Sequence, residues 1–284
     1  MKIGVRAHDY GKMEIEEAAE TLHREGYQAA QLALPKVFVG IDSYEDITYG
    51  HLERIRRAFE KWEIEIPVFG CYMDLGNPDE EVRAYAVQTL KKCLAYSKEV
   101  GAKVVGTETA YPHLDAQEKA KWYPYMIEGI KCVVEEAVRL NVKLAIEPVY
   151  WHPLENLEAV SDVMEKVGEE EHLRMIFDAS NLLQFPDTTD QNAYWREWLE
   201  KTGKYIEAMH IKDFYFDAQG RYIPTPLGEG VIEYKPISDW VLRNRPDMYL
   251  LREEMNPDIA PREIAFMKKV FGDSTCAKTG KTMT

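Results

Sequence analysis

Short apolar segments alternate with longer segments of helical spacing along almost the whole chain. The short segments have the length and apolar character of buried strands. They cover residues 2–7, 28–34, 66–72, 103–108, 143–148, 174–179, 206–212 and 248–253. The longer segments repeat apolar residues every three or four positions, as amphipathic helices do. They cover residues 15–25, 49–62, 80–100, 117–140, 157–167, 193–203, 235–243 and 261–271.

This alternation predicts parallel strands that are joined by crossover helices. Eight such units favour closure into a (β/α)8 TIM barrel, a single α/β domain that commonly has about 250 residues. An open doubly wound sheet is the alternative, and it would usually carry a glycine-rich phosphate loop after its first strand. The first predicted strand instead runs into Arg-Ala-His-Asp-Tyr at residues 6–10. We therefore predict a barrel over residues 1–272 and a polar C-terminal tail over residues 273–284.

Composition and charge narrow the range of partners. Hydrophobic residues make up 45% of the 284 residues, which is enough for a substantial core. The formal net charge is −14, whereas nucleic-acid binding needs clustered Lys and Arg. No segment reaches the roughly 18 apolar residues of a membrane span, no signal peptide is visible, and the 4 cysteines show no CxxC spacing. These features predict a cytoplasmic protein, and they argue against a nucleic acid or a membrane as its partner.

Residues that can bind a metal ion end the last four predicted strands. They are Glu147, Asp178, His210 and one of Glu253 and Glu254. Active sites of TIM barrels form at this end of the strands, and carboxylates that converge there repel one another until a cation neutralises them. Two or three carboxylates with one imidazole suit Mn²⁺, Mg²⁺ or Co²⁺, and Zn²⁺ is also possible. Each residue taken singly could instead be an ordinary polar strand end or a hydrogen-bonded core residue, but four consecutive strands favour a metal site.

The ligand from the eighth strand is either Glu253 or Glu254. Side chains alternate along a strand, so only one of the two points into the barrel. Glu253 follows the apolar part of the strand more closely, and we favour it. Glu254 remains the alternative.

The segments around these positions resemble the xylose-isomerase-like superfamily of TIM barrels, and in particular its sugar phosphate isomerase/epimerase group. The matching segments are Ile146-Glu147-Pro148, Phe177-Asp178-Ala179-Ser180-Asn181, Met209-His210-Ile211-Lys212-Asp213, Leu227-Gly228-Glu229-Gly230-Val231-Ile232 and Arg252-Glu253-Glu254. The resemblance implies one divalent metal ion held by Glu147, Asp178, His210 and Glu253. It also implies an isomerase or epimerase whose partner is a small-molecule substrate, a sugar or a sugar-derived keto compound or polyol. In such an enzyme Glu147 and Glu253 would move a proton on the carbon next to a carbonyl, through a metal-stabilised enediolate.

Further polar and aromatic residues near the strand ends are candidates for binding the substrate. They are Arg6, His8, Glu108, Trp151, His152, Asn181 and Lys212. Trp151 is a ring on which a sugar could stack. Ketose epimerases often have a substrate-binding histidine where Asn181 stands, so this asparagine could bind substrate or cap the next helix. Lys212 could contact the substrate or Glu147.

Other functions share this fold. A lyase of the inosose-dehydratase type, or one that cleaves C-glycosides, would use the same metal and the same proton abstraction. A sugar-binding barrel without catalytic activity is a further alternative, against which the complete set of four ligands argues. An apurinic endonuclease of the same superfamily needs many histidines and a basic surface, and 7 histidines with a net charge of −14 argue against it. Members of the group often form homo-oligomers, but no segment of this sequence indicates an interface.

Overall fold

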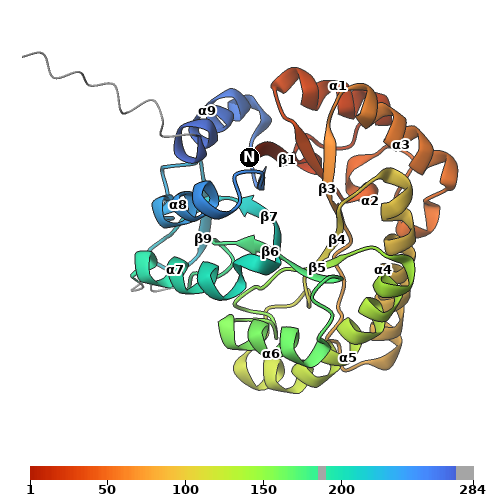
Figure 1. The fold of residues 1–284 in the computed structure, drawn as a ribbon, viewed down its shortest axis with the longest axis vertical. Helices are drawn as coiled ribbons and strands as arrows, with labels where there is room; N and C mark the ends of the chain where they lie inside the picture. Colours follow the sequence, from red (N-terminus) through yellow and green to blue (C-terminus); the bar gives the residue numbers. More distant parts are fainter. Residues whose placement is uncertain (185–189, 273–284) are drawn as a thin grey trace, which may run out of the picture.

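Parallel strands close into a barrel in the order β1-β10-β7-β6-β5-β4-β3-β2 (Figure 1). The structure is a computed structural model, and it describes residues 1–184 and 190–272. The barrel strands are β1 (Lys2–Arg6), β2 (Ala29–Leu32), β3 (Glu65–Gly70), β4 (Val104–Thr107), β5 (Leu144–Ile146), β6 (Leu173–Asp178), β7 (Ile206–Ile211) and β10 (Tyr249–Arg252). The predicted TIM barrel is therefore confirmed, and each predicted strand segment contains or overlaps one of these strands.

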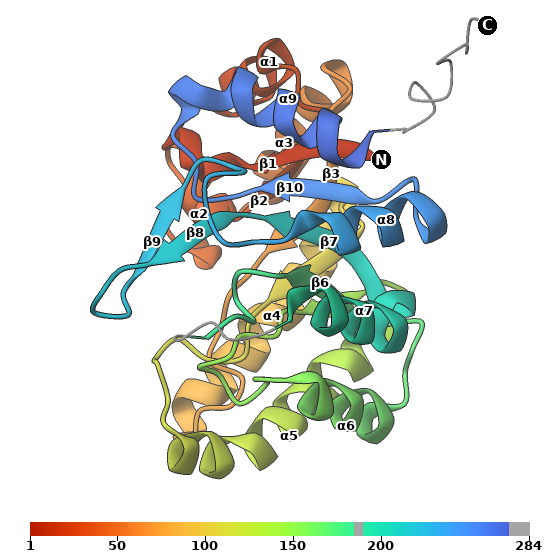
Figure 2. The ribbon, with the colours of Figure 1, turned by 90° about the vertical axis from the view of Figure 1, so that its left-hand side faces the viewer.

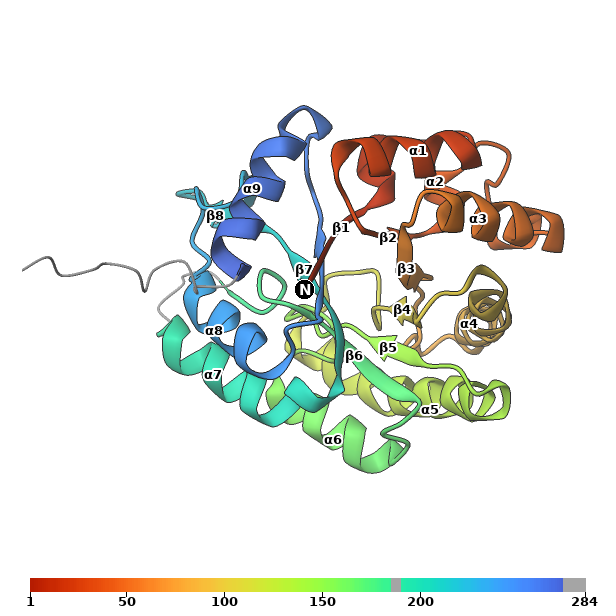
Figure 3. The same ribbon diagram turned by 45° about the horizontal axis from the view of Figure 1, so that its top comes forward.

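Helices surround the strands on the outside of the barrel (Figure 3). They are α1 (Ile15–Glu25), α2 (Leu34–Val37), α3 (Tyr49–Lys61), α4 (Glu80–Val100), α5 (Ala116–Leu140), α6 (Leu157–Val167), α7 (Gln191–Thr202), α8 (Tyr234–Asn244) and α9 (Ala260–Phe271). Local signals set several of these ends. Gly26 and Gly101 follow α1 and α4 in the left-handed conformation that closes a helix. Short 3-10 helices occur at Ala7–Tyr10, Tyr44–Asp46, Gly203–Tyr205 and Pro257–Ile259.

Two buried clusters form the core. The smaller cluster fills the inside of the barrel with one side chain from most of the strands, namely Ala29, Val68, Val104, Ala145, Ile176, Ala208 and Leu251. Gly106 belongs to the same crowded interior, because a Cβ atom there would lie 2.6 Å from Val68 Cγ1 and 2.7 Å from Ile176 Cδ1. The larger cluster lies between the strands and the helices. With its interior packed, the barrel leaves room for a site only at its ends.

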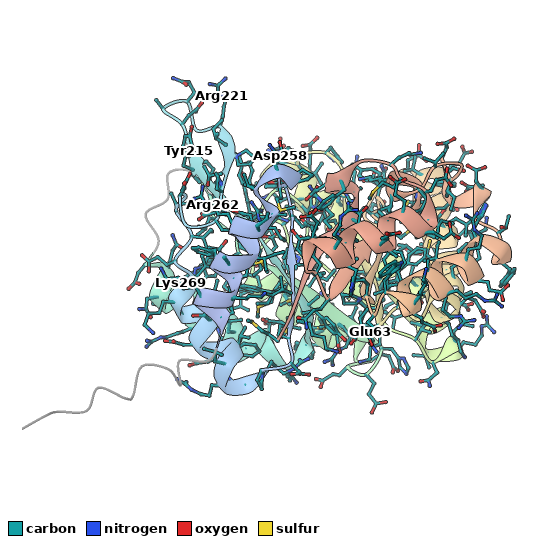
Figure 4. The ribbon with its side chains drawn as sticks, turned by 90° about the horizontal axis from the view of Figure 1, so that it is seen from above. Glu63, Tyr215, Arg221, Asp258, Arg262 and Lys269 are labelled. Atoms are coloured by element: carbon teal, nitrogen blue, oxygen red, sulfur yellow. The ribbon has the colours of Figure 1, made fainter. Side chains whose placement is uncertain are left out.

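An antiparallel hairpin follows β7, and the sequence pattern did not predict it. It consists of β8 (Asp213–Phe216) and β9 (Tyr222–Thr225), which pair with each other and not with the barrel. It projects from the end of the barrel opposite the N-terminus (Figure 2). Figure 4 shows Arg221 at its tip and Tyr215 on its flank, beyond the body of the barrel. The hairpin therefore adds a wall beside the C-terminal ends of the strands, where the predicted site lies.

Within the described residues, no helix is both long enough and apolar enough to cross a membrane. The predicted polar tail over residues 273–284 lies outside the described residues.

Candidate metal centre

Three of the predicted ligands converge at the C-terminal ends of β5, β6 and β7. Glu147 directly follows β5, Asp178 ends β6, and His210 is the penultimate residue of β7. One ligand atom from each of them lies within 4.8 Å of the others, and all three residues are buried. His210 Nδ1 is 3.2 Å from Glu147 Oε1 and 3.8 Å from Asp178 Oδ2. This geometry forms a possible metal-binding triad.

Gln31 on β2 fixes the orientation of the His210 ring and which of its two nitrogens can bind a metal. Its Nε2 donates to Glu253 Oε1 over 3.0 Å, and its Oε1 lies 2.6 Å from His210 Nε2. A carboxylate can only accept a hydrogen bond, so the amide nitrogen of Gln31 faces Glu253 and the amide oxygen faces His210. His210 must then donate from Nε2. Its Nδ1 remains the ring nitrogen that can bind a metal beside Glu147 and Asp178.

Glu253 and Glu254 point in different directions at the end of β10. Glu253 is 3% exposed, and its Oε1 lies 3.3 Å from His210 Nε2. Glu254 is half-buried, has a positive φ of 55°, and accepts a hydrogen bond from Tyr222 of the hairpin over 2.7 Å. The carboxylate that faces the triad is therefore that of Glu253. It lies on the opposite side of the His210 ring from Glu147.

Lys212 is a buried cation among these carboxylates. Its Nζ lies 2.9 Å from Asp178 Oδ2, 3.3 Å from Glu253 Oε2 and 3.7 Å from Glu254 Oε1. It does not contact Glu147, which was one of its two predicted partners. Burial would lower the pKa of Lys212, but Asp178 and Glu253 outweigh this effect and raise it well above its usual value. Lys212 therefore stays charged and partly neutralises the cluster.

The carboxylates and the imidazole have shifted acidities. Burial raises the pKa of Glu147, although His210 opposes this shift. Burial disfavours the charged form of His210, yet Glu147 and Glu253 raise its pKa to about 9. Burial also acts to raise the pKa of Glu253, but His210, Arg6 and Lys212 hold it well below its usual value. The two glutamates on either side of His210 thus have opposite tendencies to hold a proton.

The donor set fits a divalent cation. Asp178 Oδ1 accepts hydrogen bonds from the backbone and the hydroxyl of Ser180, over 2.9 Å and 2.6 Å. Its Oδ2 is buried and has no aligned hydrogen bond among the described residues. A buried carboxylate oxygen without a hydrogen bond is costly unless a charge neutralises it. Lys212 supplies part of that charge, and a metal beside Glu147 Oε1 and His210 Nδ1 would supply the rest.

Asn181 holds a metal-site carboxylate and does not cap a helix. Its Nδ2 donates to Glu147 Oε1 over 2.8 Å, and its backbone oxygen accepts from Tyr150. The next helix, α7, begins instead at Asp190, whose side chain accepts from the backbone of residues 192 and 193. The alternative in which Asn181 caps that helix is therefore wrong. Its contact with Glu147 places it inside the site.

Arg6 and His8 approach from the β1 side. Arg6 bonds Asp9 over 2.6 Å and reaches Glu253 Oε2 at 3.5 Å. His8 is half-buried, and its Nδ1 has no hydrogen-bond partner among the described residues. Burial, followed by the charge of Arg6, lowers the pKa of His8 to about 4. Both residues border the Glu253 side of the site.

Glu108, Trp151 and His152 lie at the opposite side, after β4 and β5. Trp151 stacks on His113 with ring centres 4.5 Å apart. His152 is 1% exposed, and its Nδ1 lies 3.7 Å from Glu108 Oε2. Burial and the nearby Glu147 raise the pKa of Glu108 to about 8. The predicted substrate-binding residues therefore divide into two groups on either side of the triad.

Sequence reasoning missed Gln31 and understated Asp213. Gln31 stood out only as one amide within the apolar segment Ala29–Leu32. The Asp213 carboxylate accepts backbone N–H groups from Phe214, Gly228, Gly230 and Ile232 over 2.9–3.2 Å. This contact explains why His-Ile-Lys-Asp and the later Gly-Glu-Gly segment occur together. The aspartate anchors that loop beside the hairpin.

Known proteins share this fold and parts of this sequence. L-ribulose-5-phosphate 3-epimerase UlaE of Escherichia coli K12 is 25% identical over 167 residues, which cover 57% of this chain and 53% of UlaE. The match therefore spans about half the length of that relative. A crystal structure of D-psicose 3-epimerase with D-fructose has a TM-score of 0.72 and 16% identity over 96% of this chain and 100% of its own.

A structure of the IOLI protein with a bound zinc atom is similarly close, with a TM-score of 0.72 and 17% identity over 95% of this chain and 96% of its own. At these identities the two structures bear on the fold alone. The sequence model of one family, described as "Xylose isomerase-like TIM barrel", matches residues 18–270, which is most of the chain. The chain therefore belongs to the xylose isomerase-like TIM barrel family.

Proposed function

We propose that the protein is a metal-dependent isomerase or epimerase that acts on a sugar or a sugar-derived ketone. Glu147, Asp178 and His210 would hold one divalent cation. Glu253, which faces the other nitrogen of the His210 ring, would be the fourth ligand after turning its carboxylate toward the cation. Mn²⁺, Mg²⁺ and Co²⁺ suit this set best, and Zn²⁺ also suits it. When bound, the cation would stabilise the negative charge that develops when a proton leaves the carbon next to a carbonyl.

One observation carries this proposal, namely the placement of two glutamates on opposite sides of one imidazole. Glu147 Oε1 lies 3.2 Å from His210 Nδ1, and Glu253 Oε1 lies 3.3 Å from His210 Nε2. The imidazole itself lies between these two carboxylates, so a substrate carbon would bind over the cation, within reach of both carboxylates. One carboxylate can remove a proton while the other returns a proton on the opposite face, which inverts the carbon.

The surrounding residues support this division of roles. Glu253 accepts a hydrogen bond from the Gln31 amide and faces the charged groups of Lys212 and Arg6. These groups favour its ionised form, which can accept a proton. The Glu147 carboxylate accepts a hydrogen bond from the uncharged amide of Asn181 and faces His210. The sequence similarity to L-ribulose-5-phosphate 3-epimerase UlaE supports epimerisation as the reaction.

Hydrogen exchange tests the proposal directly. Protein loaded with Mn²⁺ would be incubated in heavy water with a panel of ketoses and inosose, and mass spectrometry would follow deuterium uptake. We expect deuterium on the carbon next to the carbonyl and formation of an epimer or isomer. Glu147→Gln and Glu253→Gln should each lower the rate by a factor of about 10²–10⁴, while Glu135→Gln on the exposed face of α5 should not.

Two outcomes would count against the proposal. Loss of water from the substrate would assign the protein to the lyases, because the same proton abstraction would then lead to elimination. Absence of exchange with every substrate, together with unchanged metal binding in Glu147→Gln, would contradict a metal-dependent reaction at this site.

A further inference from the structure

Glu108 and His152 form a polar pair on the β4–β5 side of the triad. Glu108 directly follows β4, and its side chain is 29% exposed. His152 is brought back over the end of β5 by a tight turn, in which its N–H donates to Val149 O over 2.9 Å. The Glu108 carboxylate therefore opens to solvent on one side and meets a buried imidazole at 3.7 Å on the other.

The imidazole of His152 has an unused hydrogen-bonding atom. Its Nδ1 is buried and has no hydrogen-bond partner among the described residues, although Glu108 Oε2 is its nearby carboxylate oxygen. Catalytic and binding hydrogen bonds are often long in ligand-free proteins and shorten when a ligand binds. A small movement of the Glu108 side chain would satisfy Nδ1 and fix the carboxylate in place.

In the part of the chain that the structure describes, the basic groups near this pair are neutral or already held by other groups. Burial, helped by His113 and Lys119, lowers the pKa of His152 to about 3, so the ring is neutral at physiological pH. The Lys119 ammonium is occupied by Glu155 Oε2 at 2.5 Å and Tyr150 O at 2.8 Å.

Two cations, Lys212 and His210, act on the charge of Glu108. Lys212 is held between Asp178 and Glu253, and His210 is held between Glu147 and Glu253. Phosphate recognition needs such a cation or a set of converging N–H donors. Among the described residues, an anionic group at Glu108 would meet a carboxyl group and a neutral imidazole, and the nearby cations are already held by other carboxylates.

We propose that Glu108 binds a hydroxyl group at an uncharged end of the sugar substrate, and that His152 is the positioning residue that holds the Glu108 carboxylate for this contact. The substrate class is then a ketose with at least one end free of phosphate or carboxylate. This assignment rests on the proposed function for the location of the reacting carbon, but it concerns binding and not proton transfer.

Titration of the metal-loaded protein with sugars tests the assignment. The full chain loaded with Mg²⁺ would be titrated with D-fructose, D-tagatose and L-ribulose, and with D-fructose 1,6-bisphosphate, which is charged at both ends. The ¹⁵N resonances of the His152 ring, identified by their loss in His152→Asn, report on the pair. We expect a neutral ketose to shift the Nδ1 resonance, and the bisphosphate to bind at least tenfold more weakly.

Variants separate direct contact from positioning. Glu108→Ala should weaken binding of the neutral ketose about tenfold, as loss of one hydrogen bond does. Glu108→Gln should recover part of this affinity, because its amide oxygen can still accept a hydrogen bond from the sugar hydroxyl. His152→Asn should weaken binding of the same ketose, whereas Glu45→Gln, at an exposed position, should not. Only the assignment of the ring resonances uses a variant, His152→Asn, so the titration of the wild type survives poor folding of the Glu108 variants.

Each contrary result would overturn the assignment. The assignment is wrong if the bisphosphate binds as tightly as the neutral ketoses. It is also wrong if no neutral ketose shifts the His152 resonance, or if Glu108→Ala leaves the affinity for the ketose unchanged. A ketose that binds in this way without exchanging its proton would refute the proposed reaction and leave the hydroxyl subsite standing. The two failures are therefore distinguishable.

Discussion

Gln31 holds His210 through its amide oxygen, which lies 2.6 Å from the imidazole Nε2, although the two residues are 179 positions apart in the chain. The other end of the same amide is occupied by Glu253 at 3.0 Å and by the Tyr72 hydroxyl at 2.6 Å. The amide therefore cannot turn over without losing these contacts. One uncharged residue sets both the orientation of the ring and the direction of the Glu253 carboxylate.

Replacing Gln31 by Met should weaken metal binding while the fold is kept. The thioether is similar in length but cannot accept the Nε2–H of His210, so the ring would no longer be fixed with Nδ1 toward Glu147. Partners of this kind typically contribute 10–100-fold to metal affinity. Calorimetric titration with Mn²⁺ measures the change, and Gln117→Met on the surface of α5 is the matched control. Equal affinities in the two variants would show that Gln31 does not orient the ligand.

Metal affinity should fall as the pH falls below about 9. Burial opposes protonation of His210, but Glu147 and Glu253 raise its pKa to about 9, so its Nδ1 carries a proton at neutral pH. A cation must displace that proton, and one displaced proton changes the apparent affinity about tenfold per pH unit. Calorimetry at pH 6.5–8.5 in buffers of different ionisation enthalpy should detect about one proton released from His210.

The exposed His23 provides the control for this experiment. His23→Gln should leave the proton count unchanged, whereas His210→Gln should abolish both the metal binding and the proton release. A dissociation constant that does not vary between pH 6.5 and pH 8.5 would contradict His210 as a ligand.

The two neighbouring glutamates of β10 should behave differently. Glu253→Gln should lower metal affinity by at least tenfold, because its carboxylate faces His210 at 3.3 Å and removal of one charged ligand typically costs at least this much. Glu254→Gln should have little effect, because the Glu254 carboxylate is bonded to Tyr222 of the hairpin. Each variant is the matched control of the other, and the reverse order of effects would make Glu254 the fourth ligand.

Local patterns were sufficient to predict the barrel. Helices α1, α4 and α6 have the bounds that the sequence predicted, since each ends before a glycine in the left-handed conformation. The two-residue period of a strand showed that only one of Glu253 and Glu254 points inward, and Glu253 was preferred because it follows the apolar part of the strand more closely. In the structure the Glu253 carboxylate faces His210.

Contacts between distant residues were not predictable. The hairpin was missed because Asp213–Phe216 and Tyr222–Thr225 are short, and Pro224 lies within the second strand. Gln31 was missed because its partners come from β7 and β10, which no local pattern connects to β2. Lys212 was expected to contact the substrate or Glu147, but the alternation of side chains past the end of β7 directs it toward Asp178 and Glu253.

His152 should make the protein sensitive to acid. Burial holds its pKa at about 3 in the folded state, against about 6.5 in the unfolded chain. The unfolded chain therefore takes up a proton first, so stability from the neutral ring is complete above pH 6.5 and is lost as the pH falls toward 3. At pH 5 the loss is about 2 kcal/mol, from 1.5 pH units at about 1.4 kcal/mol each.

Chemical unfolding of the wild type and His152→Phe at pH 7 and pH 5 measures this contribution. The variant cannot take up that proton. Between pH 7 and pH 5 its free energy of unfolding should therefore fall by about 2 kcal/mol less than that of the wild type. His23→Phe, at an exposed position on α1, should follow the wild type. Parallel losses of stability in the wild type and His152→Phe would mean that the ring takes up its proton in the folded protein near its usual pKa.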